Sequence, residues 1–259
     1  MTRSLVTGAG HRLGRAMALY LAHRGHDVVV HYAHSAEAAE SVAAEIRALG
    51  RASFALGADL LEDEQTTELF QAAVDRLGGP ITCLVNNASI FEFDTIETAT
   101  RDSWDRHMGS NLRAPFVLTQ AMAAQGLDPV IDDQGEPLAA GLIVNMIDQR
   151  VRKLTPDFTT YTLAKSALWT LTQTAAQALA PALRVNAIGP GPTLRGGRQT
   201  PVQFAAQRAA TPLARGASPA DITAALGYLL DAPSVTGQML CVDGGQHLAW
   251  QTPDVVGTE

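Results

Sequence analysis

A tyrosine and a lysine four residues apart carry the clearest chemical signal in this sequence. Tyr161 and Lys165 fall in an apolar pattern that predicts one helix from Thr160 to Ala180, and residues four apart share a helix face. A phenol with a pKa near ~10 is a poor proton donor at neutral pH. Because a nearby ammonium group favours the phenolate, we expect Lys165 to lower the pKa of Tyr161 and make it a usable acid.

An aspartate thirteen residues before the tyrosine could work with this pair. Asp148 follows an apolar run, residues 141–147, that predicts a buried strand. A strand end beside the first turn of a helix is where α/β sheets place ligands. The Tyr-x-x-x-Lys spacing alone is also compatible with a packed tyrosine and an exposed lysine. Other motifs in the chain are needed to distinguish a catalytic pair from these structural roles.

A glycine-rich turn stands near the beginning of the chain. Gly8, Gly10 and Gly14 lie between a short strand-like run, residues 4–7, and a helical pattern over residues 16–24. Glycine permits a tight bend and a close approach of a pyrophosphate, and the helix N-terminus adds amide donors and a positive dipole end. We therefore expect a dinucleotide to bind here; a purely structural turn is the alternative.

The second predicted strand, residues 27–32, lacks the acidic residue that would hold the ribose 2′-hydroxyl of NAD in such a fold. It ends instead at His31, which His34 and Ser35 follow. Together with Arg12, these groups suit a 2′-phosphate, so the sequence favours NADP(H) over NAD(H). A solvated loop is the alternative for both histidines, and Ser35 is also the expected N-cap of the next helix.

Strand and helix patterns alternate through the first half of the chain. This alternation predicts an α/β fold: a single Rossmann-type, doubly wound parallel sheet of about seven strands with helices on both faces. Right-handed crossovers place all strand C-termini at one edge of such a sheet. The residues that follow the strands should therefore meet at that edge: Gly8, His31, Asp59, Asn87 and Asp148.

The second half adds a polar position and two irregular segments. Residues 101–124 predict one long helix, or two with a break near Asn111, which would bend the helix or hold a water. Residues 126–139 are typical of a surface excursion, and residues 194–214 of a mobile lid over a substrate. The polar tail after Trp250 is either loose or packed on a neighbouring subunit.

Length and composition limit the class of protein. The 259 residues, 46% of them apolar, suit one α/β domain over residues 1–259 rather than two small ones. A net charge of −7 argues against a nucleic-acid or anionic-membrane partner. No apolar run could span a bilayer, no targeting segment is visible, and Cys83 and Cys241 are typical of reduced core thiols, so we expect a cytoplasmic protein. The scattered histidines show no metal-ligand spacing, and no metal is expected.

Taken together, these features resemble the short-chain dehydrogenase/reductase family along nearly the whole chain. Each motif is short, but their combination and order are specific for that family. The motifs are Thr7-Gly8-x-x-x-Arg12-x-Gly14, Asp59-Leu60, Asn86-Asn87-Ala88, Asn111, Tyr161-x-x-x-Lys165, Arg184-Val-Asn186, Pro190-Gly191 and Val242-Asp243-Gly244-Gly245.

Two departures from the general family pattern are informative. The family usually has glycine where Arg12 stands and a catalytic serine where Asp148 stands. Both departures resemble the pteridine reductase branch, which includes pteridine reductases and bacterial dihydromonapterin reductases. That branch often has arginine where His34 stands, and a neutral histidine is a weaker phosphate partner.

The resemblance implies a role for each matched residue. The catalytic residues would be Asp148, Tyr161, Lys165 and Asn111, and a pterin would contact Arg12, Ser89, Phe91, Asp148 and Tyr161. Core packing is the alternative for Phe91. The residues expected to bind NADP(H) are Gly8, Gly10, Arg12 and Gly14 at the pyrophosphate, His31, His34 and Ser35 at the 2′-phosphate, Asp59 and Leu60 at the adenine, Asn87 and Ala88 near its ribose, Lys165 at the nicotinamide ribose, and Pro190 and Gly191 beside the nicotinamide. His11, Leu13, Ser89 and Tyr161 are also expected to contact the cofactor.

The implied reaction is hydride transfer from NADPH to a C=N bond of a pterin, with a proton supplied by a Tyr161–Asp148–Lys165 relay. A partly buried acid beside a tyrosine should have a raised pKa. One alternative is an NADPH-dependent reductase of an unrelated ketone or imine. Another is a non-catalytic dinucleotide-binding protein, against which the intact Tyr161 and Lys165 pair argues. The resemblance also implies a homotetramer.

Overall fold

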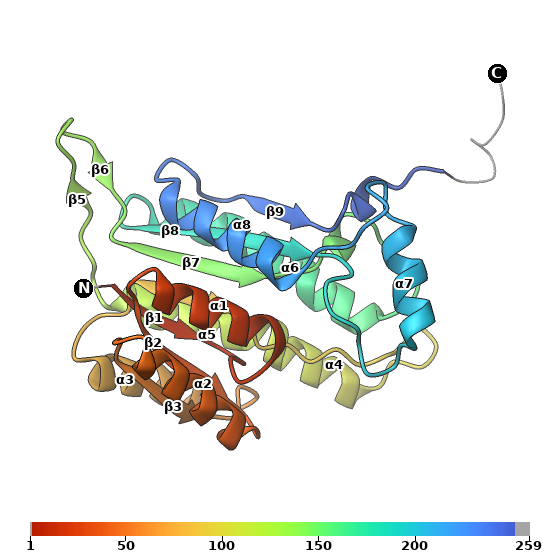
Figure 1. Ribbon diagram of the computed structural model, residues 1–259, viewed down its shortest axis with the longest axis horizontal. Coiled ribbons are helices and arrows are strands. Elements are labelled where there is room, and N and C mark those ends of the chain that lie inside the picture. The colour runs from red at the N-terminus through yellow and green to blue at the C-terminus, as the bar shows by residue number, and fades with distance from the viewer. Residues whose placement is uncertain (1, 252–259) are drawn as a thin grey trace.

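The computed structural model describes residues 2–251 of the chain. Nearly all of the polar tail after Trp250, for which two states were expected, lies outside the described residues. The described part is built around one large sheet with helices packed on both of its faces (Figure 1).

Seven parallel strands form this sheet, in the order β3-β2-β1-β4-β7-β8-β9. The order reverses direction between β1 and β4, as in a doubly wound sheet, so the predicted fold class is confirmed. The strands are short and apolar because helices cover both faces of the sheet. Their bounds are β1 Arg3–Val6, β2 Asp27–Tyr32, β3 Ser53–Gly57, β4 Cys83–Asn86, β7 Gly141–Met146, β8 Leu183–Pro190 and β9 Met239–Val242.

Two helical layers enclose the sheet. One layer packs on a core formed with β1, β2 and β7, and the other packs on the opposite face. The first helix begins at Arg12, one turn earlier than the sequence pattern predicted. The first layer contains α1 Arg12–His23, α2 Ala36–Ala48 and α8 Pro219–Asp231, and the second contains α3 Asp63–Leu77, α5 Ala114–Ala124 and α6 Thr159–Leu179.

The break expected near Asn111 is present as a π-helical turn, η1 (Gly109–Arg113), between α4 (Arg101–Met108) and α5. The Asn111 side chain is fully buried and makes two hydrogen bonds to one residue. It accepts from the Ile90 amide at 2.9 Å and donates to the Ile90 carbonyl at 2.9 Å. The polar task of Asn111 is therefore to fix the segment that follows β4.

The irregular segments lie at opposite ends of the sheet (Figure 1). The surface excursion forms a small antiparallel hairpin, β5 (Val130–Ile131) and β6 (Pro137–Leu138), beyond the end where the strands begin. Residues 194–214 contain α7 (Pro201–Ala209) and lie beyond the end where the strands finish. Two single turns, η2 (Gln149–Val151) and η3 (Gln246–Leu248), complete that end.

The two cysteines are both free thiols: Cys83 is buried and Cys241 is partly buried. None of the helices between residues 2 and 251 combines the length and apolar composition that a bilayer crossing requires. 

Candidate active site

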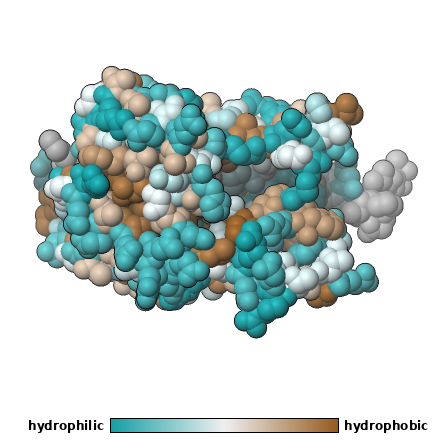
Figure 2. Space-filling model, turned by 90° about the horizontal axis from the view of Figure 1, so that it is seen from below, coloured by the Kyte–Doolittle hydropathy of each residue, from teal (hydrophilic) through white to brown (hydrophobic). Residues whose placement is uncertain are grey.

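A cavity of about 640 Å³ opens at the edge where the strands finish. Its size lies in the range of cofactor and small-molecule sites, and Figure 2 shows the surface hollowed between two parts of the molecule. The following residues that the sequence singled out line it: Gly8, His11, Arg12, Leu13, Gly14, His31, His34, Asp59, Leu60, Asn87, Ala88, Ser89, Phe91, Asp148, Tyr161, Lys165, Pro190 and Gly191.

The glycine-rich turn is shaped so that the start of α1 faces the cavity. Gly8 has φ +61°, a left-handed conformation that favours glycine. A β-carbon on Gly14 would lie 2.3 Å from the Gly8 carbonyl oxygen, so α1 can approach the turn only with glycine there. His11, the N-cap residue, makes no side-chain capping bond, which leaves the helix N-terminus able to bind an anionic group. These features fit a dinucleotide pyrophosphate.

Three expected site residues do not line the cavity. The backbone of Gly10 lies against α2, where an added β-carbon would be 3.3 Å from the Ala39 nitrogen, so Gly10 serves helix packing. Ser35 stands at the N-cap position of α2, and its side chain makes no capping bond. Asn111 does not line the cavity, and both polar atoms of its side chain are bonded to the backbone of Ile90, which does. The catalytic role expected of Asn111 stays a prediction.

The role expected of His31 also needs correction. The side chain is buried, and both of its ring nitrogens are occupied by the protein. Nδ1 accepts a hydrogen bond from the Gly8 amide at 3.0 Å, and Nε2 lies 3.0 Å from the Ala58 carbonyl oxygen. Burial lowers the pKa of His31 to about 4, so the ring is neutral. His31 thus supports the glycine-rich turn and has no free donor for a 2′-phosphate, whereas His34 is exposed at the cavity.

Arg12 stands in a strained backbone conformation, with φ +52°. Because the left-handed backbone conformation disfavours residues with a β-carbon, glycine would be less strained than arginine at this position. The guanidinium group reaches across the cavity and donates to the carbonyl oxygens of Leu194 at 3.1 Å and Arg195 at 2.9 Å. The side chain therefore connects the glycine-rich turn with the segment that leads to α7.

Two substitutions should separate the backbone strain from the side-chain contacts. Arg12→Gly and Arg12→Ala both remove the bonds to residues 194 and 195, but only glycine relieves the strain. We expect the alanine variant to be less stable than the glycine variant by about 1 kcal/mol, with similar losses of activity. Thermal unfolding and kcat/KM of both variants provide the measurement. Equal stabilities would contradict the strained conformation.

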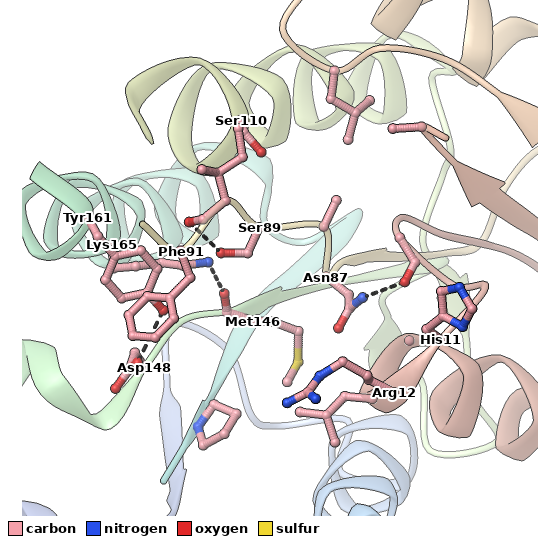
Figure 3. Close-up of a pocket in the computed structure, with 18 of the residues that line it drawn as sticks. His11, Arg12, Asn87, Ser89, Phe91, Ser110, Met146, Asp148, Tyr161 and Lys165 are labelled. Carbon is pink, nitrogen blue, oxygen red and sulfur yellow. Dashed lines mark hydrogen bonds between the residues drawn. The ribbon is translucent and has the colours of Figure 1, made fainter. Parts of the chain in front are cut away.

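The other end of the cavity holds the proposed reacting groups (Figure 3). The Tyr161 hydroxyl donates to Asp148 Oδ2 at 3.1 Å, and Asp148 Oδ1 accepts from the Arg150 amide at 2.8 Å. Lys165 Nζ donates to the Met146 carbonyl oxygen at 2.8 Å. An ammonium group has three donors, so two remain for a ligand. The carboxyl, the phenol and the ammonium predicted from the sequence thus lie together.

Burial dominates the protonation of this cluster. It raises the pKa of Asp148, as expected, and lowers the pKa of Lys165 to about 8. Burial also raises the pKa of Tyr161 well above its usual value, and the contact with Asp148 raises it further. The expected lowering of the Tyr161 pKa by Lys165 is therefore wrong for this structure. The Asp148 carboxyl touches the hydroxyl, whereas Lys165 Nζ lies 5.8 Å from the ring centroid.

Phe91 is not a core residue, since 44% of it is exposed. Its ring stacks on Phe158 at 4.4 Å between centroids and meets the Tyr161 ring edge-on at 4.6 Å. The Arg198 guanidinium lies 5.0 Å above the Phe91 ring and 5.2 Å above the Phe158 ring, and donates to the Phe91 carbonyl oxygen at 3.0 Å. The packing alternative for Phe91 is excluded, because its half-exposed ring lines the cavity, with Phe158 and Arg198 packed against it.

The sequence missed several residues around the cavity. Phe158 and Arg198 carried no motif, because Phe158 precedes its helix with φ +60° and Arg198 lies in an irregular segment far along the chain. Others are neighbours of residues or segments that were singled out, and adjacency was the only available signal. They are Ala33, Leu61, Ile90, Ser110, Met146, Ile147, Thr193 and Leu194. Arg106, in α4, also lines the cavity and is adjacent to no residue that was singled out. Within the described range, no three His, Cys, Asp or Glu side chains are arranged to hold a metal ion.

Comparison with known proteins identifies the class of this enzyme. A family model described as enoyl-(acyl carrier protein) reductase matches residues 8–247. The chain is 32% identical to the 3-oxoacyl-(acyl-carrier-protein) reductase FabG of Staphylococcus aureus over 254 residues, which cover 96% of this chain and 99% of that protein. An uncharacterised oxidoreductase of Methylorubrum extorquens is 34% identical over 250 residues, 93% of this chain and 96% of that protein. The chain belongs to the short-chain dehydrogenase/reductase family.

Two solved structures are similar over almost the entire chain. FolM alternative dihydrofolate reductase 1 from Brucella suis, in complex with NADP, is 42% identical, with a TM-score of 0.90 and 98% of each chain covered. The angucycline C-6 ketoreductase LanV, with bound NADP, is 30% identical, with a TM-score of 0.85 and 96% of each chain covered. The family predicted from the motifs is thus confirmed, and the FolM structure is a neighbour of the expected branch.

Proposed function

We propose that this protein is an NADPH-dependent reductase that reduces a C=N bond of a pterin, converting a dihydropterin to a tetrahydropterin. The observation that carries the proposal is the hydrogen bond of 3.1 Å between Tyr161 and Asp148 at the inner end of the cavity. A carboxyl can exchange a proton with a ring nitrogen or accept an N–H from an aminopyrimidinone-like ring. A serine at the same place would serve a carbonyl oxygen instead.

The cofactor assignment draws support from both ends of the cavity. The FolM and LanV structures each contain NADP. In this chain, the uncapped start of α1 suits a pyrophosphate, and the segment after β2 places the exposed His34, rather than a carboxylate, at the cavity. Asp59 and Leu60 would meet the adenine, and Asn87 and Ala88 its ribose. Pro190, the last residue of β8, and Gly191 would meet the nicotinamide.

The substrate assignment draws support from the aromatic platform. The flat ring of Phe91 borders the same cavity as Asp148 and Tyr161, and it would stack on a flat heteroaromatic ring. Ser89 and Arg12 would bond the polar edge of that ring. The FolM neighbour, named for dihydrofolate reduction, favours a pterin or folate substrate over an unrelated one.

The reaction adds a hydride and a proton across the C=N bond. When bound, reduced nicotinamide supplies the hydride, which the carbon accepts. Tyr161 and Asp148 hold the proton that the ring nitrogen takes, and the raised pKa of Asp148 keeps a proton in this pair closer to neutral pH. Lys165 would bind the nicotinamide ribose with its two remaining donors and stabilise negative charge left on the pair.

Residues 194–214 would act as the lid over the substrate. Two contacts already tie the beginning of this segment to the cavity walls: the Arg12 bonds to residues 194 and 195, and the Arg198 bond to Phe91. Closure of such a segment excludes water from the reacting groups and strengthens their electrostatic interactions.

A ketone reductase remains the alternative function, since the FabG and LanV relatives are named for oxoacyl and keto substrates. A steady-state assay separates the two. With NADPH, the kcat/KM of the purified protein for dihydrobiopterin or dihydromonapterin should be at least about tenfold above that for any ketone in a panel. With the same pterin, NADPH should be oxidised more efficiently than NADH. Ketone turnover without pterin turnover would overturn the pterin assignment. Binding of NADPH without any turnover would support a non-catalytic role.

We also propose a homotetramer. A shallow depression of about 500 Å³ on the face formed by α4, η1, α5 and α6 is lined largely by apolar side chains, which suits contact with another subunit. Its apolar lining residues are Met108, Leu112, Phe116 and Leu171. Light scattering coupled to gel filtration would test this, and a monomer at micromolar concentration would exclude it.

A further inference from the structure

The helix that carries Tyr161 and Lys165 begins without a cap from its own side chains. Its N-cap residue, Phe158, makes no side-chain capping bond. Asp94, from the segment after β4, supplies the missing acceptors. Its carbonyl oxygen accepts from the amides of Phe158 at 2.7 Å and Thr159 at 3.4 Å, and its Oδ1 accepts from the Thr160 amide at 3.1 Å.

Such a cap is energetically meaningful because the first amides of a helix have no acceptors within the helix, and a negative charge there interacts favourably with the helix dipole. Asp94 is buried, with 2% of its surface exposed. Burial opposes its ionisation, but hydrogen bonds from the Thr160 hydroxyl, the Thr160 amide and Ser103 outweigh it and lower the pKa of the carboxyl. Asp94 is therefore an ionised residue, distant in sequence, that caps the N-terminus of α6.

A chain of side-chain hydrogen bonds continues from this cap. The Thr160 hydroxyl donates to Asp94 Oδ2 and lies 2.7 Å from His107 Nδ1. His107 Nε2 accepts the Glu92 amide at 3.1 Å. Since an amide can only donate, Nε2 carries no proton, and the neutral ring must donate from Nδ1 to Thr160. Every hydrogen bond in the chain Glu92–His107–Thr160–Asp94 thus has a fixed direction.

The groups around His107 are consistent with a neutral ring. Burial lowers its pKa, the carboxylates of Asp94 and Glu92 and a hydrogen bond to the Ser103 carbonyl oxygen oppose this, and Arg106 lowers it further. The ring is completely buried. Protonation of Nε2 would place a donor against the Glu92 amide and break that bond, so the chain of bonds requires the neutral form.

These bonds join the two segments that bring aromatic groups to the cavity. Glu92 directly follows Phe91, and Thr160 directly precedes Tyr161. The His107 ring meets the Tyr161 ring at 5.9 Å between centroids, and Phe91 meets the same ring at 4.6 Å. Asp94, His107 and Thr160 themselves lie outside the residues that line the cavity.

We propose that Asp94, Thr160 and His107 are positioning residues that hold the Phe91 ring and the Tyr161 hydroxyl at a fixed separation for the bound substrate. Naming that substrate a pterin rests on the proposed function; the positioning itself does not. A displacement of about 1 Å between reacting groups can lower the rate about 10²-fold. A connection made of short, directed hydrogen bonds between buried groups is suited to prevent such a displacement.

Thr160→Val is the sharpest test, because it replaces the hydroxyl with a methyl group of similar size and keeps the backbone amide that donates to Asp94 Oδ1. We expect kcat/KM to fall about 10- to 100-fold, mainly in kcat, with the NADPH dissociation constant changed less than about threefold. Thr160→Ser retains the hydroxyl and should recover most of the activity. The assay uses whichever substrate the wild-type enzyme turns over, so a failed pterin assignment does not affect this comparison.

A matched control loses the same atom elsewhere. Thr119 is also buried, in α5, where its hydroxyl donates to the Pro115 carbonyl oxygen at 2.7 Å. Thr119→Val should lower thermal stability and leave kcat/KM near the wild-type value. If Thr160→Val keeps wild-type kcat/KM, or if both variants lose activity only in proportion to stability, the positioning role is excluded.

A second readout does not depend on turnover. Nitrogen-15 NMR of the imidazole rings should find His107 in the Nδ1–H tautomer and His31 in the opposite, Nε2–H tautomer, because the Gly8 amide donates to His31 Nδ1. In Thr160→Val the His107 resonances should shift while those of His31 stay unchanged. A His107 ring in the Nε2–H tautomer would overturn the proposed chain of bonds.

Discussion

Replacing Tyr161 by phenylalanine should lower kcat by about 10²- to 10⁴-fold, the range that a positioned general acid contributes. The substitution removes the hydroxyl that donates to Asp148 Oδ2 at 3.1 Å and leaves the ring contacts with Phe91 and His107 in place. The loss should therefore appear in kcat, with little change in NADPH affinity. Stopped-flow measurement of NADPH oxidation, together with fluorescence titration of NADPH binding, separates the two effects.

Tyr20→Phe is the matched control for this experiment. The Tyr20 hydroxyl accepts a hydrogen bond from Arg24 at 3.0 Å on α1, away from the cavity lining. The control variant should retain wild-type kcat. Full activity of Tyr161→Phe would remove the catalytic assignment of this residue, and with it the main support for an acid supplied by the protein.

Asp148→Asn should also lower pterin turnover severely, by about 10²-fold. Asparagine keeps the oxygen that caps η2 by accepting from Arg150, but it presents an amide donor where the carboxyl accepted the Tyr161 proton. The pair can then no longer exchange a proton. Asp148→Ser extends the test, because it restores the group that the family usually has; unchanged pterin reduction by this variant would count against a role for the carboxyl.

The pH dependence of the reaction should identify the carboxyl directly. The pKa of Asp148 is raised, so its acid form is present below that pKa and is lost as the pH rises through it. In the wild type, kcat/KM should accordingly fall with increasing pH, and fall again near pH 8 as Lys165 loses its proton. Asp148→Asn should lack the first fall and keep the second. A pH profile identical to that of the wild type would exclude Asp148 as a carrier of the transferred proton.

The same raised pKa predicts an effect on stability. Between the ordinary pKa of an aspartate and the raised value, the folded protein binds more protons than the unfolded chain, so the free energy of unfolding decreases as the pH rises through this window. The wild type is therefore destabilised by the ionised carboxyl above that window. Asp148→Asn removes the charge and should unfold at a higher temperature than the wild type at pH 8, while being less active.

Much of the site follows from the sequence because parallel sheets impose a simple rule. Once strands and helices alternate with right-handed crossovers, the residues that follow each strand meet at one edge. This rule, with the four-residue spacing of Tyr161 and Lys165, was sufficient to bring Gly8, Asp148 and Tyr161 to one cavity. The family resemblance added the departures at Arg12 and Asp148, which distinguish a branch within the family.

What the sequence by itself determined was therefore which residues share the edge of the sheet; the tertiary structure decided what each of them does there. His31 and Gly10 stand at the expected edge, but burial against Ala58 and close packing against Ala39 give them supporting roles. The protonation of Tyr161 depends on burial and on contact with Asp148, and the cap that Asp94 gives to α6 joins residues 66 positions apart. Such contacts depend on burial and on distances between remote segments, and local spacing contains neither quantity.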